Sequence, residues 1–134
     1  MPPPRDVWYS YAVVRVVPRP ERGEFLNVGV ILFARTARFL AARIAIDHAR
    51  LCAFAPDLDL TAVERHLAAF VAVCDGTPDG GPIAALSPSE RFHWLTAPRS
   101  AVIQISPVHT GHTDNPQTAL DNHFNALVAP PSGQ

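Results

Sequence analysis

Apolar and β-branched residues dominate the first third of the chain and predict three strands, over residues 8–17, 25–34 and 38–46. The connection over residues 18–23 is rich in Pro, Gly and Arg, and the connection over residues 35–37 is shorter still. Sequential strands with short connections favour antiparallel pairing, so the pattern predicts a three-stranded meander.

The apolar period then changes from two to that of a helix. The spacing predicts a short helix over residues 47–54 and a longer one from Asp57 or Asp59 to about Cys74. Ser87 and Glu90 have the spacing of a capping box and predict a further helix to about Trp94. These helices provide the apolar faces that can cover the sheet.

The last part of the chain predicts one more strand and one more helix. Residues 101–106 alternate as a strand, and Asp114 or Asn115 can cap a final helix with Leu120 and Phe124 on its apolar face. The order predicts an α+β fold: a mainly antiparallel sheet, made of the meander plus a later strand, with helices on one face. We expect a single globular domain over residues 7–128, with flexible tails at 1–6 and 129–134.

Charge and hydropathy limit the partners. The chain has 134 residues, 11 cationic side chains that are all Arg, 12 acidic side chains and a net charge of −1, which argues against nucleic-acid binding. No apolar run is long enough for a membrane span, residues 1–6 do not resemble a signal peptide, and two cysteines suit free thiols, so we expect a cytoplasmic protein. The positive mean hydropathy favours an apolar face covered by a protein partner or by a second copy in a homo-oligomer.

A dense polar run over residues 96–116 is the first candidate site. Arg99 and Ser100 precede the predicted strand, where a guanidinium and a hydroxyl suit a phosphate or carboxylate. Gln104, Ser106 and His109 follow on the same stretch and extend this candidate anion-binding and ligand-binding set. The alternative is that Arg99 lies on the surface while Ser100 makes a local turn bond.

The first hairpin contains a second polar group. Arg15, Glu24 and Asn27 could form a ligand-binding pocket beside the sheet. Alternatively, Asn27 and Glu24 tie down their own loop, and Arg15 pairs with Glu24. Strand alternation places Arg15 on the same side as Tyr9 and Tyr11, and it places Asn27 on the same side as Phe25 and Ile31.

The segment 109–114 carries the residues that a metal or proton-transfer site would use. His109, His112 and Asp114 are ligand types for zinc or iron. Their spacing is typical of a loop, however, and no third strong ligand joins the two histidines nearby in the sequence, so we predict no metal. His109 is the one credible proton-transfer group. No cofactor motif is present in the sequence, so we predict no cofactor, and the interpretation leans away from an enzyme.

Two stretches resemble one bacterial family, the domain-of-unknown-function family 3037. They are the hairpin core Arg22-Gly23-Glu24-x-x-Asn27-Val28-Gly29-Val30 and the later run from Pro98 through Gln104, Ser106 and His109 to Gly111. The resemblance spans residues 8–128. It implies a small intracellular bacterial protein with no assigned activity, of a kind often encoded beside a HipA-like kinase protein. His112 and Asn115 depart from the family pattern.

Two functions follow as hypotheses. The first is a non-catalytic interaction or regulatory domain that partners another protein, for which the resemblance suggests a HipA-like kinase protein. The second is an enzyme or ligand-binding domain for a phosphorylated or nucleotide-like molecule that uses Arg99, Gln104 and His109.

Overall fold

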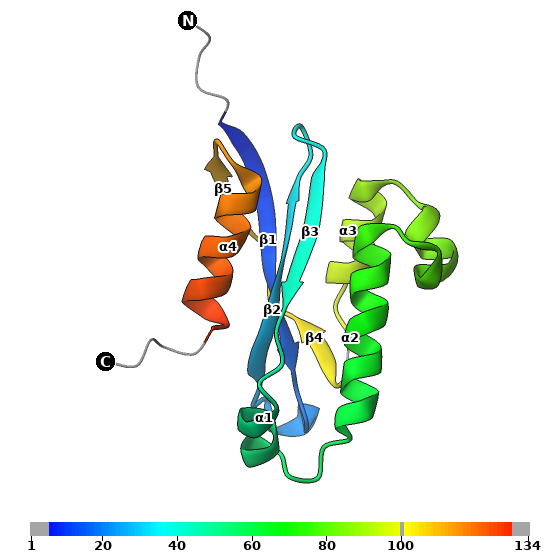
Figure 1. Cartoon of the computed structure of the whole chain (residues 1–134), viewed down its shortest axis with the longest axis vertical. Coiled ribbons are helices and arrows are strands. Elements are labelled where there is room, and N and C mark those ends of the chain that lie inside the picture. The colour runs from blue at the N-terminus through cyan, green and yellow to red at the C-terminus, as the bar shows by residue number, and fades with distance from the viewer. Residues whose placement is uncertain (1–5, 100, 130–134) are drawn as a thin grey trace, which may run out of the picture.

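The computed structural model describes residues 6–99 and 101–129, so most of both predicted tails, and Ser100, lie outside the described residues. Its centre is a five-stranded antiparallel sheet (Figure 1). The strands are β1 (Val7–Val16), β2 (Leu26–Ala34), β3 (Phe39–Ile44), β4 (Ile103–Ile105) and β5 (His109–Thr113). The first three form the predicted meander, and β4 and β5 both pair with the free side of β1. The α+β class and the antiparallel sheet are confirmed.

Helices begin at the polar residues that the sequence marks as caps. The carboxylate of Asp59 accepts the amide of Ala62 at 3.1 Å, and Ser87 and Glu90 form a complete capping box. Gly76 ends its helix in the left-handed conformation, with φ of 71°. The helices of the described chain are α1 (His48–Phe54), α2 (Leu60–Asp75), α3 (Pro88–Thr96) and α4 (Pro116–Leu127), with 3-10 turns η1 (Pro20–Arg22) and η2 (Pro78–Ala85).

The helices cover both faces of the sheet rather than one, which corrects the predicted arrangement. Ile31 of β2 belongs to the core formed with α1, α2 and α3, whereas its neighbours Val30 and Leu32 pack against α4. Figure 1 shows α4 on one side of the sheet and α2 with α3 on the other. The physical reason is that both the odd-numbered and the even-numbered positions of β2 are mostly apolar. A strand with two apolar faces needs a covering layer on each face.

The segment His109–Thr113 is a strand, not the loop that its spacing suggested. It pairs with the first half of β1 from Val7 to Tyr11, and the expected strand over residues 101–106 is reduced to Ile103–Ile105. The two short strands form one edge that is interrupted at residues 106–108. Pairing with β1 therefore overrides the low strand propensity of this polar sequence.

A β-bulge in β2 places Asn27 on a different side of the strand from the one that simple alternation predicts. The register of β1 with β2 shifts between Val14, which faces Gly29, and Arg15, which faces Asn27, so Val28 is the extra residue. Asn27 therefore lies on the α4 side with Arg15, not on the side of Ile31 where alternation predicted it.

Candidate functional site

Three of the predicted site residues meet on the α4 side of the sheet. Arg15 faces Asn27 on one neighbouring strand and Gln104 on the other. The Asn27 amide donates to the carbonyl of Leu127 at 3.0 Å, and the Gln104 amide donates to the carbonyl of Ala101 at 2.8 Å. Two atoms, Arg15 Nε and Asn27 Oδ1, are buried without a hydrogen-bond partner among the described residues. Of this polar cluster of Arg15, Asn27 and Gln104, Asn27 is the member that bonds to the last turn of α4.

Glu24 and Arg99 do not join that cluster. Glu24 accepts two hydrogen bonds from the guanidinium of Arg22, at 2.8 and 3.1 Å, so the expected pairing of Arg15 with Glu24 is wrong. The hydrogen bond from Arg22 lowers the pKa of Glu24. Arg99 stacks on the ring of Trp94 at 4.3 Å and donates to the Trp94 carbonyl at 2.6 Å. Ser100 lies outside the described residues.

Ser106 is buried, and its hydroxyl is used inside the fold. It lies where β4 ends, and its Oγ accepts the amide of Val13 at 2.8 Å while donating to the carbonyl of Pro107 at 2.9 Å. The backbone amide of Ser106 in turn donates to the Val13 carbonyl. The side chain thus completes the ladder at the point where the edge strand is interrupted.

The candidate metal ligands are divided by the strand that contains them. His109 faces Tyr11 and His112 faces Trp8, and Tyr11 and Trp8 lie on opposite faces of β1. Within residues 6–99 and 101–129, no group of three or more His, Cys, Asp or Glu side chains is placed to hold a metal ion. His112 forms an ion pair with Asp6 at 3.1 Å.

An aromatic cluster that sequence reasoning did not identify lies between β1 and α4. Tyr9 and Tyr11 project from the same face, and His123 of α4 stacks on Tyr11 at 3.9 Å while its Nε2 lies 2.9 Å from the Tyr9 hydroxyl. His109 lies beside Tyr11, with its ring centre 5.4 Å away. Desolvation lowers the pKa of His123 and raises that of Tyr9. More than a hundred residues separate the partners, so no local pattern marks them.

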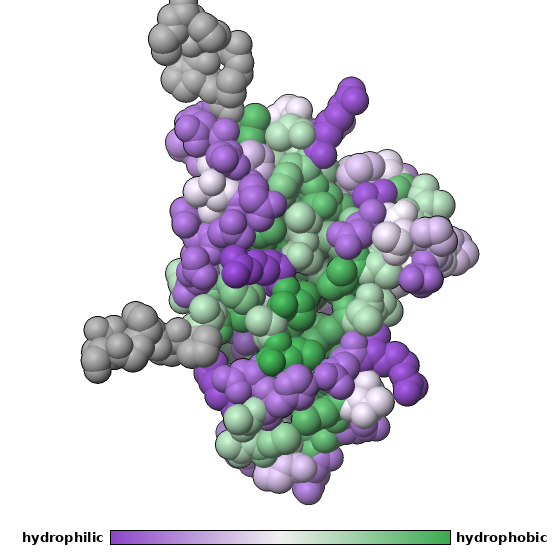
Figure 2. All heavy atoms as spheres, viewed as in Figure 1, coloured by the Kyte–Doolittle hydropathy of each residue, from purple (hydrophilic) through white to green (hydrophobic). Residues whose placement is uncertain are grey.

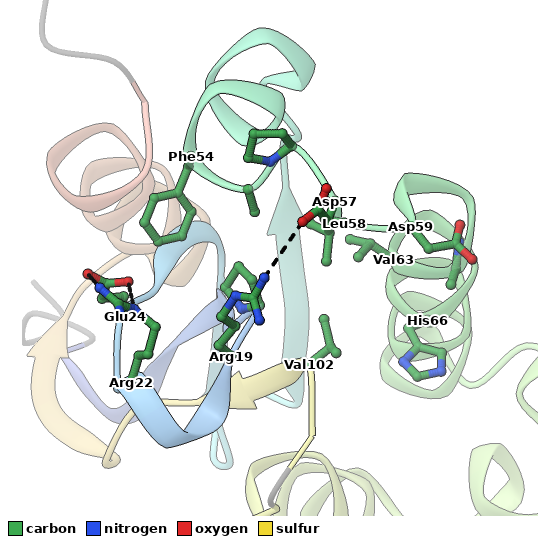
Figure 3. Close-up of a pocket in the computed structure, with 14 residues that line it drawn as sticks. Arg19, Arg22, Glu24, Phe54, Asp57, Leu58, Asp59, Val63, His66 and Val102 are labelled. Atoms are coloured by element: carbon green, nitrogen blue, oxygen red, sulfur yellow. Dashed lines mark hydrogen bonds and ion pairs between the residues drawn. The ribbon is translucent and has the colours of Figure 1, made fainter.

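A cavity of about 610 Å³ lies at the opposite end of the sheet from the β2–β3 turn. Figure 3 shows Arg19 reaching across it to Asp57, with an ion pair of 3.7 Å. Val63 and Val102 contribute to an apolar floor. The rim holds two arginines and three carboxylates, from Arg19, Arg22, Glu24, Asp57 and Asp59. Such a rim offers no net attraction to a phosphorylated molecule.

A second groove, of about 450 Å³, opens beside Trp8. Its lining includes Trp8 of β1, Phe33 of β2, Arg35 directly after β2, and His93 of α3. The side chain of Trp8 is 71 % exposed, the highest exposure of any large apolar residue in the described chain. We call this feature the Trp8 groove; it is also lined by Tyr9, Ser10, Ser89 and Thr110.

Comparison with known proteins identifies a family but no activity. No curated protein and no solved structure matches the chain significantly. Among the helices that the structure describes, none combines the length and apolar character needed to cross a membrane. The sequence profile of DUF3037, described as a protein of unknown function, matches residues 11–128. That match covers most of the chain, which therefore belongs to the DUF3037 family.

Proposed function

We propose that this chain is a non-catalytic interaction module that binds another protein through the Trp8 groove. The observation that carries the proposal is the 71 % exposure of Trp8 on the border of a groove. Tryptophan and arginine are the side chains that most often dominate binding energy at protein interfaces. Here Trp8 and Arg35 border the same groove, and the apolar ring of Phe33 also lines it.

The arrangement of the other polar residues supports binding rather than chemistry. Catalysis by this chain would need a nucleophile or base, with its orienting partner, held together in a cavity. Arg99 is engaged with Trp94, Ser106 with backbone groups and Glu24 with Arg22. Arg99, Gln104 and His109 are the trio on which the alternative of a phosphorylated ligand depends, and no hydrogen bond within the described residues connects Arg99 to either of the others.

The family resemblance supplies the partner to test, a HipA-like kinase protein encoded beside the chain. We expect the two proteins, expressed together, to elute as one complex in size-exclusion chromatography. We expect Trp8→Ala to weaken that complex by ~30-fold or more, since truncating a central interface aromatic costs about 2 kcal/mol or more. The Trp8 side chain is mostly exposed, so the variant should keep the melting temperature of the wild type.

Trp94→Ala is the matched control. Trp94 is also an exposed tryptophan, at 42 %, but it stacks with Arg99 and does not line the Trp8 groove. This variant should bind as the wild type does. Two results would contradict the proposal: absence of a complex with the HipA-like protein, and equal weakening by both tryptophan variants.

A further inference from the structure

The two edges of the sheet are built differently. One edge consists of β4 and β5, which are short, interrupted at residues 106–108 and provided with Pro107 inside the interruption. Breaks and prolines of this kind prevent an edge from pairing with another chain. The other edge is β3, a continuous strand of six residues without proline or glycine. Only β3 therefore keeps the features of an edge that can accept a further strand.

The outer side of β3 presents its backbone groups at alternate residues. The amide of Ala45 donates to the carbonyl of Val28 in the direction of β2, at 2.8 Å. Hydrogen-bonding direction alternates along an antiparallel strand, so the backbone groups of Ala41 and Arg43 also point to β2. Those of Leu40, Ala42 and Ile44 then point away from the sheet, where no strand of the described chain pairs with them.

The side chains beside this edge are apolar. Figure 2 shows an apolar strip over the part of the face where Figure 1 places β3, between the more polar surfaces of α4 and of α2 with α3. Leu40, Ala42 and Ile44 are half-buried and pack toward α2, while Phe39 and Ala41 pack toward α4. Helical layers flank the strand on both sides. A second copy paired with this edge would bring its own two helical layers against α2 and α4, whereas a single extended segment brings none.

Charge near the edge indicates which segment would bind. The β2–β3 turn carries Arg35 and Arg38, both exposed, and no ion pair within the described residues involves either. Arg43, farther along β3, is held against α4 by Asp121 at 3.0 Å and by the ring of Phe124. The side chain of Arg43 is thus held at α4 and does not block pairing at the outer side of β3. The positive charge of the β2–β3 turn favours acidic residues in a segment that pairs with β3.

We propose that β3 accepts an extended segment of a partner protein, paired antiparallel to it through the backbone of Leu40, Ala42 and Ile44. The segment has alternating apolar residues and acidic residues at its C-terminal end, beside Arg35 and Arg38. This is recognition by strand addition, in which the main chain supplies affinity and alternate side chains supply specificity. Arg35 also lines the Trp8 groove, but Leu40, Ala42 and Ile44 do not, so either proposal can fail without the other.

The test is an NMR titration of the full isotope-labelled chain with a synthetic peptide in which valine alternates with threonine before two glutamates. We expect the largest amide shifts at Leu40, Ala42 and Ile44, and smaller ones at Ala41 and Arg43. Replacing the two glutamates by lysines should weaken binding ~5-fold or more. Ala42→Pro, which removes an outward amide, should weaken binding ~10-fold or more.

Peptides that are N-methylated at alternate residues lack the amide hydrogens at those positions. They test the pairing with the wild-type chain, so the result does not depend on whether Ala42→Pro folds. One set of methylated positions should abolish binding, because those amides face β3, and the other set should leave it intact. Shifts confined to another surface, equal binding of both methylated peptides, or no binding at millimolar peptide would overturn the proposal. A dimer of the free chain that Ala42→Pro dissociates would also overturn it and assign the edge to a second copy.

Discussion

Individual polar side chains in this protein complete hydrogen bonds that the backbone leaves open. Ser106 accepts the Val13 amide where β4 ends, and Asn27 donates to the Leu127 carbonyl where α4 ends. Both residues were candidate ligand-binding residues by sequence. The hydroxyl of Ser106 is needed there because a buried backbone amide without a partner is costly, whether or not a ligand is near.

Ser106→Ala should lower the free energy of unfolding by about 1–3 kcal/mol, since it leaves the buried Val13 amide without a partner. Urea denaturation at equilibrium measures this change. Ser10→Ala is the control. Ser10 lies in β1, where it pairs with β5, and its hydroxyl makes no hydrogen bond within the described chain. Its replacement should therefore change the free energy of unfolding by no more than ~0.5 kcal/mol. Equal values for the two variants would show that the Ser106 hydroxyl does not complete the ladder.

The His123 cluster makes stability depend on pH. Desolvation lowers the pKa of folded His123 below 6.5, its ordinary value. The unfolded chain therefore binds the proton more readily, and the contribution of neutral His123 is present above pH ~6.5 and is lost as the pH falls below it. Tyr9 and Tyr11 are the titratable groups beside the ring, and His109 lies against Tyr11.

Melting temperature should accordingly decrease between pH 7 and pH 5, and the decrease should be smaller in His123→Asn. Differential scanning fluorimetry across this range measures both slopes. His66→Asn is the control, because His66 is exposed on α2. If wild type and His123→Asn lose stability in parallel, the stacked histidine does not carry this pH dependence.

At the scale of elements, α4 is the part whose position depends most on single contacts. Its N-terminus is capped by Asn115, whose side chain accepts the Thr118 amide at 3.2 Å. Its C-terminus is attached to β2 by the bond from Asn27 to Leu127. Between these ends, Leu120 and Phe124 pack on the sheet. The bulge at Val28 is what turns Asn27 toward the helix.

Asn27→Ala should cost about 1 kcal/mol of unfolding free energy, because the Leu127 carbonyl loses a donor but lies near solvent. The last turn of α4 should also exchange its amide hydrogens faster. Arg99→Ala removes an exposed stack on Trp94 and an exposed hydrogen bond to the Trp94 carbonyl, and its cost should stay within ~0.5 kcal/mol. A larger loss in Arg99→Ala than in Asn27→Ala would reverse our assignment of the structural role.

At the scale of the whole molecule, one sheet is shared by two cores. Alternate residues of β2 belong to opposite cores, so disrupting either helical layer exposes the back of the same strand. β1 has strand partners on both sides and helices over both faces. Amide hydrogen exchange should reflect this central position of β1 and β2, since protection from exchange follows burial and strand pairing.

Amides of β1 and β2 should exchange slowest, whereas β3 should show an alternating pattern. Ala41 and Arg43 should be protected by β2, and Leu40, Ala42 and Ile44 should exchange faster. NMR-detected exchange at single-residue resolution measures the pattern. Uniform protection along β3 would mean that its outer amides are already paired, which is incompatible with an edge open to a partner strand.

The sequence by itself determined the elements of this protein, because caps and apolar periods act within a few residues. Asp59, Gly76 and the Ser87–Glu90 box mark helix ends that the structure confirms, and the three first strands lie within two residues of their predicted bounds. Their antiparallel order follows from short connections. The family was also accessible from the sequence, through the Arg22–Val30 motif.

Only the tertiary structure decided which face each helix covers, and with it the environment of every candidate residue. Both faces of β2 are apolar, which permits a helical layer on each face, but this pattern does not predict that α4 forms one of these layers. The strand at His109–Thr113 exists because β1 has a free side there, and the contact between Tyr9 and His123 joins residues from opposite ends of the chain. Pairing register, the bulge at Val28 and the two sheet edges arise from long-range contacts, which short sequence patterns do not encode.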